Sequence, residues 1–303
     1  MSSTQADVKD RISSVQNIRK ITRAMEMVAA ARLRRAEQRI EALRPYAGAI
    51  RRMTRQAAEA AGTEIGSLPV LKEHEAERSV ALLLVTGDRG LAGAFNSQII
   101  RPGVRAAVEH EGEGRSVAFS AVGRRGVSTL AFRGREVQGT YTGFTDRPAY
   151  ADARDIAEDL VSAYVDEKVD RVEMFYNGYV SPLTQEVRRE TLLPLQQATI
   201  LEGSDDESEG ADEESGHHAL VEYEPDPEEI LSRLVPDYVE ISVYRALLES
   251  TASEHGARMT AMRSASENAG EMIQDLTLEM NRARQAEITQ EILEVVAGAE
   301  GLG

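Results

Sequence analysis

Both ends of the chain repeat apolar residues at alternating spacings of three and four. Near the C-terminus the alternation is strict from Met259 to Ala283, and near the N-terminus it runs from Val8 to Ile50 with one slip after Val28. This alternation places apolar side chains in a narrow stripe along one side of a helix, the pattern of a coiled coil. The two terminal segments are therefore predicted to form long helices that pack on each other as an antiparallel coiled coil.

The stripe can be assigned residue by residue. In the N-terminal segment its members are Val8, Ile12, Val15, Ile18, Ile21, Met25 and Val28, then, after the slip, Leu33, Ala36, Ile40, Leu43, Ala47 and Ile50. In the C-terminal segment the stripe shifts by one residue after Ala283 and continues through Ile288, Ile292 and Val295. The slip is a stutter, which changes supercoiling without ending a helix, and Pro45 is a predicted kink. A helix over 239–297 would be about 85 Å long, too long for one compact domain to enclose.

Between the terminal segments the period of the apolar pattern changes. Short runs rich in β-branched residues lie at 79–86, 116–122 and 172–177, and amphipathic stretches at about 96–110 and 152–167 separate them. Strands that alternate with helices predict an α/β fold, here a Rossmann-like layered domain with a mainly parallel sheet.

These patterns divide the chain into three zones. We expect an N-terminal coiled-coil helix over 1–60, an α/β domain over 75–235 and a C-terminal coiled-coil helix over 237–298. Within the domain, residues 202–229 contain thirteen acidic residues and no Lys or Arg. The first part of this segment is too polar to pack, so an acidic mobile loop is predicted at about 202–218.

The N-terminal helix is basic although the chain is acidic. Residues 7–55 contain thirteen basic and five acidic side chains, whereas the whole chain carries a net charge of −16. A solvated helix face normally mixes the two signs in pairs four residues apart. The excess therefore indicates that this helix lies opposite an acidic protein surface or a nucleic acid. The overall acidity disfavours nucleic acid as a partner of the whole molecule.

One segment qualifies as a small-molecule site. GDRGLAGAFN, residues 87–96, follows a strand and opens a helix, as phosphate-binding turns do. Its glycines are spaced G-x-x-G-x-x-G, however, and the Lys-Ser/Thr pair of a phosphate-binding loop is missing. A structural turn is the favoured interpretation. The alternative is an α/β nucleotide-binding protein with a coiled-coil interaction arm.

No other residues indicate chemistry. The chain has no Cys, which excludes disulfides and thiol catalysis. His217 and His218 lie in the acidic segment, and His74, His110 and His255 have no sequence neighbour that suggests catalysis or metal binding. We therefore predict no catalytic, cofactor-binding or metal-ligating residue. No run of the sequence approaches the length and apolarity of a membrane span.

Three segments resemble a known family, the gamma subunit of F-type ATP synthases. Residues 12–30 read I-x-S-V-x-N-x-x-K-I-T-x-A-M-x-M-V-A-A and resemble that family's N-terminal helix. DRGLAGAFN (88–96) is similar to its aspartate-arginine-glycine-leucine turn, and 253–299 resembles its C-terminal helix. The family's terminal motif is matched by Ile288, Thr289, Glu291, Glu294, Gly298 and Ala299. Ala92 and Ala94 depart from it, because bacterial relatives often carry Cys and Gly there.

The resemblance implies a non-catalytic rotor shaft without a cofactor. The coiled coil would stand inside a ring of alpha and beta subunits, and the α/β domain would bear on the epsilon subunit and the membrane c-ring. Proton flow would turn ring and shaft, and the asymmetry of the shaft would drive the catalytic sites through different affinities. The protein would be peripheral to the cytoplasmic face of the plasma membrane.

The resemblance also implies contact residues. Contacts with the beta subunits are expected at Lys20, Arg23, Met25, Arg32, Arg34, Arg284, Gln285, Thr289 and Glu291. Contacts with the c-ring and epsilon subunit are expected at Glu222, Tyr223 and Glu224. Arg284 falls one residue past the strict stripe, so its guanidinium is expected to point outward, toward an acidic loop of a beta subunit.

Overall fold

The computed structural model describes residues 5–61, 70–72, 74, 76–195 and 227–300. They belong to two compact units, one formed by the chain up to Ala31 and from Arg258 onward, the other by Arg32–Ala257. The acidic loop predicted at 202–218 lies outside the described residues, as do His217 and His218.

The unit over Arg32–Ala257 contains a five-stranded sheet in the order β3-β2-β1-β4-β5. Its strands are β1 (Ser79–Val85), β2 (Ser116–Val122), β3 (Val137–Tyr141), β4 (Arg171–Tyr179) and β5 (Gln185–Leu193). The first four run parallel, and β5 pairs antiparallel with β4. The predicted α/β fold with a mainly parallel sheet is confirmed.

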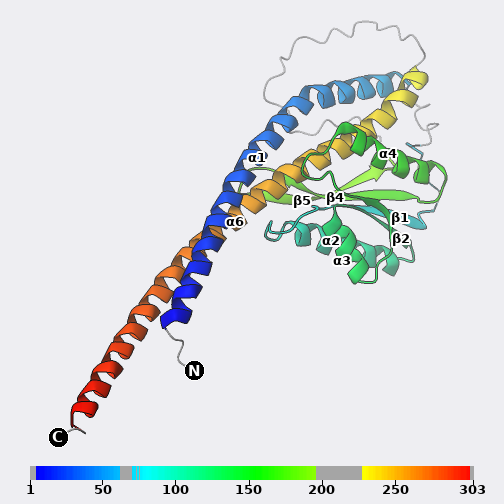
Figure 1. The fold of residues 1–303 in the computed structure, drawn as a ribbon. Coiled ribbons are helices and arrows are strands. Elements are labelled where there is room, and N and C mark those ends of the chain that lie inside the picture. The colour runs from blue at the N-terminus through cyan, green and yellow to red at the C-terminus, as the bar shows by residue number, and fades with distance from the viewer. Residues whose placement is uncertain (1–4, 62–69, 73, 75, 196–226, 301–303) are drawn as a thin grey trace. The chain divides into compact units, whose positions relative to one another are not determined.

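Helices cover both faces of this sheet. Figure 1 shows α2 (Phe95–Gly112) and α3 (Arg124–Phe132) on one face, and α4 (Tyr150–Val165) with the first part of α6 (Pro227–Glu300) on the other. Strand β1 therefore faces two cores: Val80, Leu82 and Leu84 pack under α2 and α3, and Ala81, Leu83 and Val85 under α4 and α6. Burial on both faces explains why this strand is an unbroken apolar run rather than an alternating one.

Three elements of this unit are absent from the sequence-based prediction: β3, α3 and β5. Strand β3 is a short edge strand that contains Gly139. Strand β5 reads QEVRRETLL and carries charged side chains toward both neighbouring layers. Neither strand has the apolar run that marks a buried strand, which is why the pattern missed them.

Helix α1 agrees with its predicted limits, and α6 extends beyond its own. Helix α1 (Gln5–Ala61) has 57 residues and continues through Pro45. Helix α6 has 74 residues and begins at Pro227, well before the predicted start at Val239. The start was misjudged because Leu231 and Val235, both buried, continue an apolar repeat of four rather than a three-four alternation. Among the described residues, no helix is long and apolar enough to cross a membrane.

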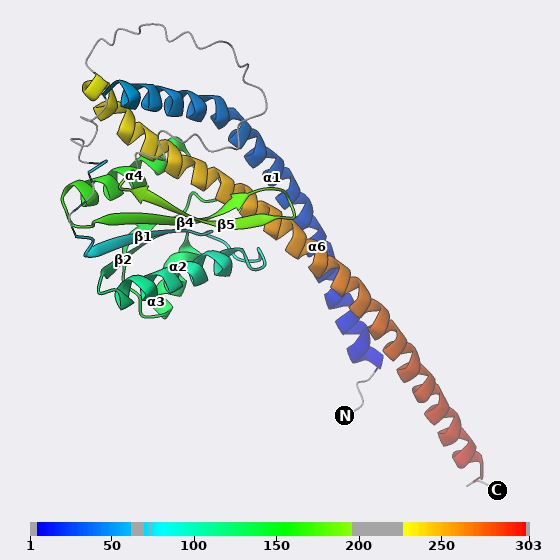
Figure 2. The ribbon, with the colours of Figure 1, turned by 180° about the vertical axis from the view of Figure 1, so that it is seen from behind.

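The other unit is an antiparallel pair of helices, the first part of α1 and the last part of α6 (Figure 2). Arg263 forms an ion pair with Glu26 at 2.9 Å, and Arg19 packs over Gly270. Glu26 comes later in α1 than Arg19, whereas its partner Arg263 comes earlier in α6 than Gly270. The two helices therefore run in opposite directions. The predicted antiparallel coiled coil is confirmed.

The seam of this pair differs from the predicted stripe. Val8, Thr22 and Ala29 are buried, whereas Ile18, Ile21 and Val28 are more than half exposed. The buried Val8, Thr22, Ala29 and Leu33 all fit one three-four alternation without a slip, so the predicted stutter was wrong. The buried face of α6 includes large side chains such as Met262 and Leu276, but opposite Thr22 it is small, at Ser266, Ala269 and Gly270. Small facing residues let helices approach closely, which leaves room in the seam for Thr22 and Ala29 rather than for larger side chains.

One carboxylate organises the loops at the amino edge of the sheet. Asp170 accepts hydrogen bonds from the backbone N–H groups of Arg78 and Ser79, both at 2.8 Å, and lies 2.7 Å from His74 Nδ1. His74 in turn stacks on Tyr164, with ring centroids 4.6 Å apart. Burial raises the pKa of the Asp170 carboxyl, but the hydrogen bonds outweigh burial and hold the pKa below its ordinary value.

We expect Asp170→Asn to lower the free energy of unfolding at pH 7 by about 1–3 kcal/mol, because one charged acceptor oxygen is replaced by an NH2 group and its partly buried donors lose a partner. The folded-state pKa lies below the unfolded one, near 3.8, so the contribution is complete above that value and declines as pH falls through the folded pKa. Urea unfolding at pH 7 and pH 3 measures both effects, and the gap between variant and parent should narrow at pH 3. Asp166→Asn, at an exposed pair with Lys168, is the control, and an equal loss there would contradict the prediction.

Candidate functional site

The turn after β1, residues 87–94, is fastened to its neighbours by side-chain hydrogen bonds. Thr86 Oγ1 donates to the Val122 carbonyl at 2.6 Å and accepts from the Gly126 N–H at 2.9 Å. The Gly87 N–H donates to Asn96 Oδ1 at 2.9 Å. These bonds join the carboxyl ends of β1 and β2 to the starts of α2 and α3.

Asp88 completes this fastening. Its carboxylate accepts from the N–H groups of Arg124 and Gly143 at 3.1 and 2.8 Å, and from Thr145 Oγ1 at 3.1 Å. The carboxylate thus connects the turns that follow β1, β2 and β3. Its acceptor positions are occupied by the protein's own donors, so Asp88 has a structural role here.

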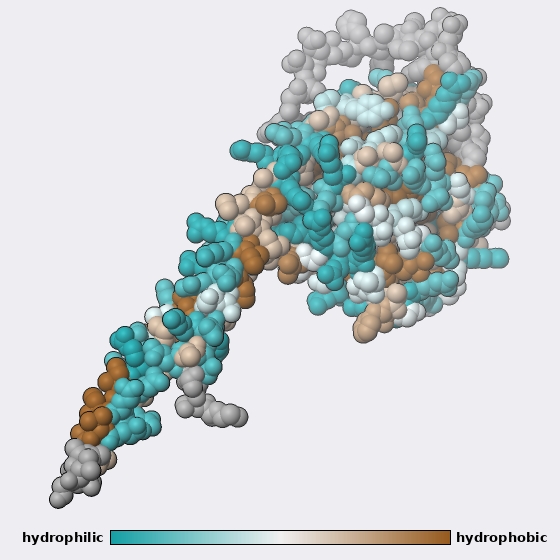
Figure 3. All heavy atoms as spheres, in the orientation of Figure 1, coloured by the Kyte–Doolittle hydropathy of each residue, from teal (hydrophilic) through white to brown (hydrophobic). Residues whose placement is uncertain are grey.

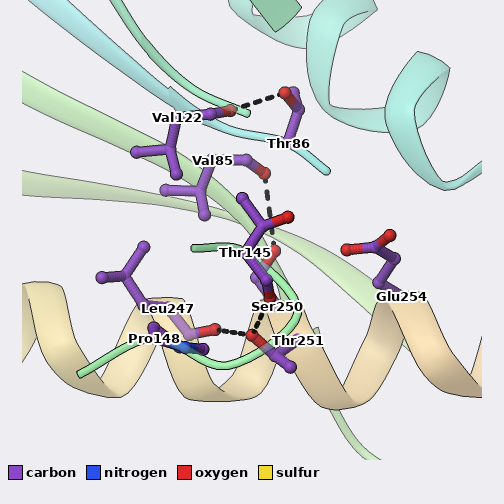
Figure 4. Close-up of a pocket in the computed structure, with 9 residues that line it drawn as sticks. All are labelled: Val85, Thr86, Val122, Thr145, Pro148, Leu247, Ser250, Thr251 and Glu254. Atoms are coloured by element: carbon purple, nitrogen blue, oxygen red, sulfur yellow. Dashed lines mark hydrogen bonds between the residues drawn. The ribbon is translucent and has the colours of Figure 1, made fainter. Parts of the chain in front are cut away.

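Helix α6 occupies the crevice at this edge of the sheet. In a doubly wound sheet the ligand crevice lies beyond the carboxyl ends of the strands, and Figure 4 shows Ser250, Thr251 and Glu254 of α6 facing the ends of β1 and β2. Thr251 Oγ1 donates to the Thr145 carbonyl at 2.9 Å. The cavity left among these groups is about 10 Å³, room for roughly one water molecule.

The approach of α6 is close enough to require a glycine. A Cβ atom on Gly87 would lie 2.7 Å from the carboxyl carbon of Glu254, whose side chain is buried. A nucleotide phosphate at this turn would meet that carboxylate and would have to displace the helix. The favoured interpretation of GDRGLAGAFN as a structural turn therefore agrees with the geometry, and the nucleotide-site alternative does not.

The outer side of the same turn is basic and partly apolar. Arg89 and Arg32 share Asp146, with N–O distances of 3.2 and 2.9 Å. Arg124 is largely exposed, as is Leu91, which has a φ of 62°. A bulky residue in the left-handed region is strained, and strain of this kind clusters at functional sites. This surface was not predicted from the sequence, because the glycines of the turn fit the pattern of a ligand-binding loop.

Among the predicted contact residues of the coiled-coil unit, Lys20 and Arg23 are exposed and Met25 is half-buried. They share the surface of α1 with the outward-facing Ile18, Ile21 and Val28. The exterior of this helix thus combines basic and apolar side chains over the same turns.

The end of α6 is exposed on all sides. The strict alternation from 259 to 283 is buried or half-buried, as predicted, whereas Arg284, Gln285, Thr289 and Glu291 are exposed. The predicted continuation through Ile288, Ile292 and Val295 was wrong as a packing stripe, since these side chains are 48%, 58% and 72% exposed. Figure 3 shows the resulting apolar surface near the C-terminal end of α6.

The remaining predicted contacts lie elsewhere. Arg34 is exposed on α1, in the unit that contains the sheet. Arg32 is only partly exposed and already pairs with Asp146. Glu222, Tyr223 and Glu224 fall outside the described residues.

Two histidines have carboxylate partners that their sequence neighbours did not indicate. His74 pairs with Asp170, and the buried His110 lies 3.4 Å from Glu173 and 2.9 Å from Arg115. Both partners are distant in sequence, so no local motif announces them. The described part of the chain holds no group of three or more His, Cys, Asp or Glu residues that could ligate a metal ion.

Comparison with known proteins gives a consistent result. A family model described as ATP synthase matches residues 4–302. The ATP synthase gamma chains of Nostoc punctiforme and Rubrobacter xylanophilus are each 42% identical, with 97% and 98% of this chain and 98% and 97% of those relatives covered.

Solved structures agree. A chain of the Tetrahymena thermophila mitochondrial ATP synthase central stalk and c-ring has a TM-score of 0.59 at 28% identity, covering 81% of this chain and 99% of that one. A chain of the Euglena gracilis mitochondrial ATP synthase has a TM-score of 0.66 at 16% identity, covering 98% and 94%. At that low identity, the second likeness concerns the fold.

We expect no saturable binding of MgATP to the isolated chain, because α6 and the Glu254 carboxylate occupy the crevice that a nucleotide would need. Isothermal titration at micromolar protein measures this directly. The same titration with Gly87→Ala, which crowds the crevice further, should give the same flat trace. Micromolar affinity that the substitution abolishes would restore the nucleotide-binding interpretation.

Proposed function

Because the chain belongs to the family of ATP synthase gamma chains, central-stalk subunits of that complex, we propose that it serves as the rotor shaft of an F-type ATP synthase. In this role it couples proton-driven rotation of a membrane c-ring to ATP synthesis on alpha and beta subunits. The shaft performs no chemistry itself. It changes the affinities of the catalytic sites by presenting a different side to each in turn.

The observation that carries the proposal is the uncovered end of α6. Beyond Ala283 the helix presents large apolar side chains that are 48–72% exposed: Ile288, Ile292, Leu293, Val295 and Val296. A short helix end standing alone in water is only marginally stable, and a contiguous apolar surface marks an interaction site. A ring of partner subunits around this end would bury that surface and hold the helix in place while it turns.

The middle of the shaft supports the same role. Ile18, Ile21 and Val28 face outward, and Lys20 and Arg23 stand exposed beside them. Apolar side chains allow sliding against a smooth partner surface, and basic ones fit acidic loops. An exposed ion pair contributes about 0–1 kcal/mol, weak enough to break and re-form as the shaft turns.

The proposal extends to individual contacts. The beta subunits would meet Lys20, Arg23, Met25, Arg32, Arg34, Arg284, Gln285, Thr289 and Glu291. Arg32 would do so as one member of its pair with Asp146. Guanidinium groups suit acidic loops because their planar donors match carboxylates and keep their charge at any working pH. The c-ring and the epsilon subunit would meet Glu222, Tyr223 and Glu224, and the complex would hold the chain at the cytoplasmic face of the plasma membrane.

We expect Arg284→Leu to leave the thermal stability of the free chain unchanged, because this exposed side chain has no buried partner to lose. Steady-state ATP hydrolysis by a complex reconstituted with alpha and beta subunits should fall severalfold. Arg282→Leu, also exposed but on another side of the helix, is the matched control. Normal turnover with Arg284→Leu, or an equal loss in both variants, would remove Arg284 from the contact surface.

Reversing the charges of Glu222 and Glu224 to Lys tests the lower contact. ATP-driven proton pumping in vesicles should fall severalfold while hydrolysis continues, because the acidic pair would no longer match its partners. The control reverses Glu213 and Glu214, two acidic residues of the same segment that carry no proposed contact. If pumping per ATP hydrolysed is the same in both variants, the proposed contact is wrong.

A further inference from the structure

A row of four charged side chains joins strand β5 to helix α6. Arg188 and Glu190 stand two residues apart on the strand, and Arg245 and Glu249 stand one turn apart on the helix. Arg188 pairs with Glu249 at 3.4 Å, and Glu190 pairs with Arg245 at 2.9 Å. On each element the arginine precedes the glutamate, and each side chain faces the opposite charge on the other element. The charges therefore alternate in sign both along the row and across it.

The row is built into the unit rather than scattered on its surface. Glu249 has a side chain only 11% exposed, and the other three are about one-third exposed. The buried Tyr176 of β4 donates its hydroxyl to Glu190 at 2.6 Å. Arg188 lies over Gly178 of β4, where a Cβ atom would come within 2.5 Å of its Nε.

The row holds one charge favourably and another unfavourably: burial lowers the pKa of the Arg245 guanidinium, but the Glu190 carboxylate beside it outweighs burial and raises that pKa. Burial raises the pKa of the Glu249 carboxyl, and the neighbouring Arg245 and Arg188 offset this only in part. The fold therefore holds the ionised carboxylate less favourably than water does. Buried ion pairs often add little stability compared with apolar residues of similar size, and their best-attested role is to specify register.

Register is what the apolar contact of α6 leaves open. Five of the six buried α6 residues in this core recur at every fourth position, Leu231, Val235, Val239, Val243 and Leu247; the sixth is the small Ala246. A screw motion of α6 through about one turn, or about 5.4 Å, would place each of them where a similar residue stood. Apolar burial is non-directional, so this seam alone distinguishes poorly between neighbouring registers.

The charges do distinguish them. Displacement by one turn in one direction brings Arg245 opposite Arg188, and in the other direction it brings Glu249 opposite Glu190. Either movement exchanges two attractive contacts for one repulsive contact in a partly desolvated place. The alternation thus works against the wrong registers as well as for the right one.

We propose that this row, Arg188, Glu190, Arg245 and Glu249, is a register lock that transmits torque between the α/β unit and helix α6. The inference rests on the proposed rotor function, because only a shaft under load must resist such a screw motion. Helix α6 continues without a break beyond Ala257, so torque applied to the sheet reaches the helix through this lock together with the contacts of Thr251 and Glu254. The four side chains are positioning residues for energy coupling and touch no catalytic site.

The decisive variant keeps both ion pairs between the strand and the helix and removes the alternation. In Glu190→Arg/Arg245→Glu both strand residues are basic and both helix residues are acidic, so a one-turn displacement now restores an attractive contact. Adding Arg188→Glu and Glu249→Arg gives a fully inverted row that alternates again. Both variants lose the hydrogen bond from Tyr176 to Glu190. The inverted row also replaces Arg188 over Gly178 and the buried Glu249, so normal pumping by the inverted row cannot come from keeping those side chains. The control exchanges Glu229 and Arg233, an exposed pair on the same helix at 2.8 Å.

Each chain is reconstituted into the complete complex in vesicles, and ATP hydrolysis and ATP-driven proton pumping are measured together. The uniform row, Glu190→Arg/Arg245→Glu, should hydrolyse ATP in the presence of an uncoupler within about twofold of the parent rate. Its pumping against a proton gradient should fall at least threefold. The inverted row and the control should pump normally. Normal pumping by the uniform row, or equal losses in the uniform and inverted rows, would overturn the lock. If the unsubstituted chain supports neither activity, the rotor function itself fails, and that result is seen before any variant is compared.

Discussion

Helix α6 packs against the sheet through an apolar seam in which every fourth residue is buried, from Leu231 to Leu247, and most other features of the unit depend on this contact. The seam closes the core that α4 covers from the same side. It also carries Ser250, Thr251 and Glu254 into the crevice beyond β1. A fold that commonly binds ligands at this edge here uses the edge to hold its own helix.

Filling the crevice changes what the α/β unit can do. The polar side chains at the end of β1 and in the turn after it form hydrogen bonds with neighbouring segments: Thr86 with Val122, and Asp88 with Arg124, Gly143 and Thr145. What remains available is the outside of the molecule, where basic and apolar side chains stand together on α1 and at the end of α6. Such surfaces suit contacts with other proteins that form and break repeatedly. The chain belongs to the family of ATP synthase gamma chains, and in the proposed rotor role these contacts would change as the shaft turns.

Sequence patterns predicted the elements whose burial is regular. The apolar run at 79–86 predicted β1 because both faces of that strand are covered. The alternation from 259 to 283 predicted the coiled coil because one stripe of α6 is buried there. They failed where polar groups are buried or apolar ones are not. Strand β5 went unseen because its inner positions include Arg188 and Glu190, which are matched by charges on α6. Ile18, Ile21 and Val28 were placed in the seam because they are apolar, although Thr22 and Ala29 fill it.

The sequence by itself determined that two long helices flank an α/β domain, that the first of them is basic, and that no cysteine chemistry takes part, because these follow from periodicity and composition. The resemblance of its motifs to a known family supplied the role. Only the tertiary structure decided that α6 seals the crevice, which stripe of α1 is buried and which faces outward, and how the charges of β5 meet those of α6. Each of these depends on which surfaces approach one another across long separations in the chain, and local spacing carries no record of that approach.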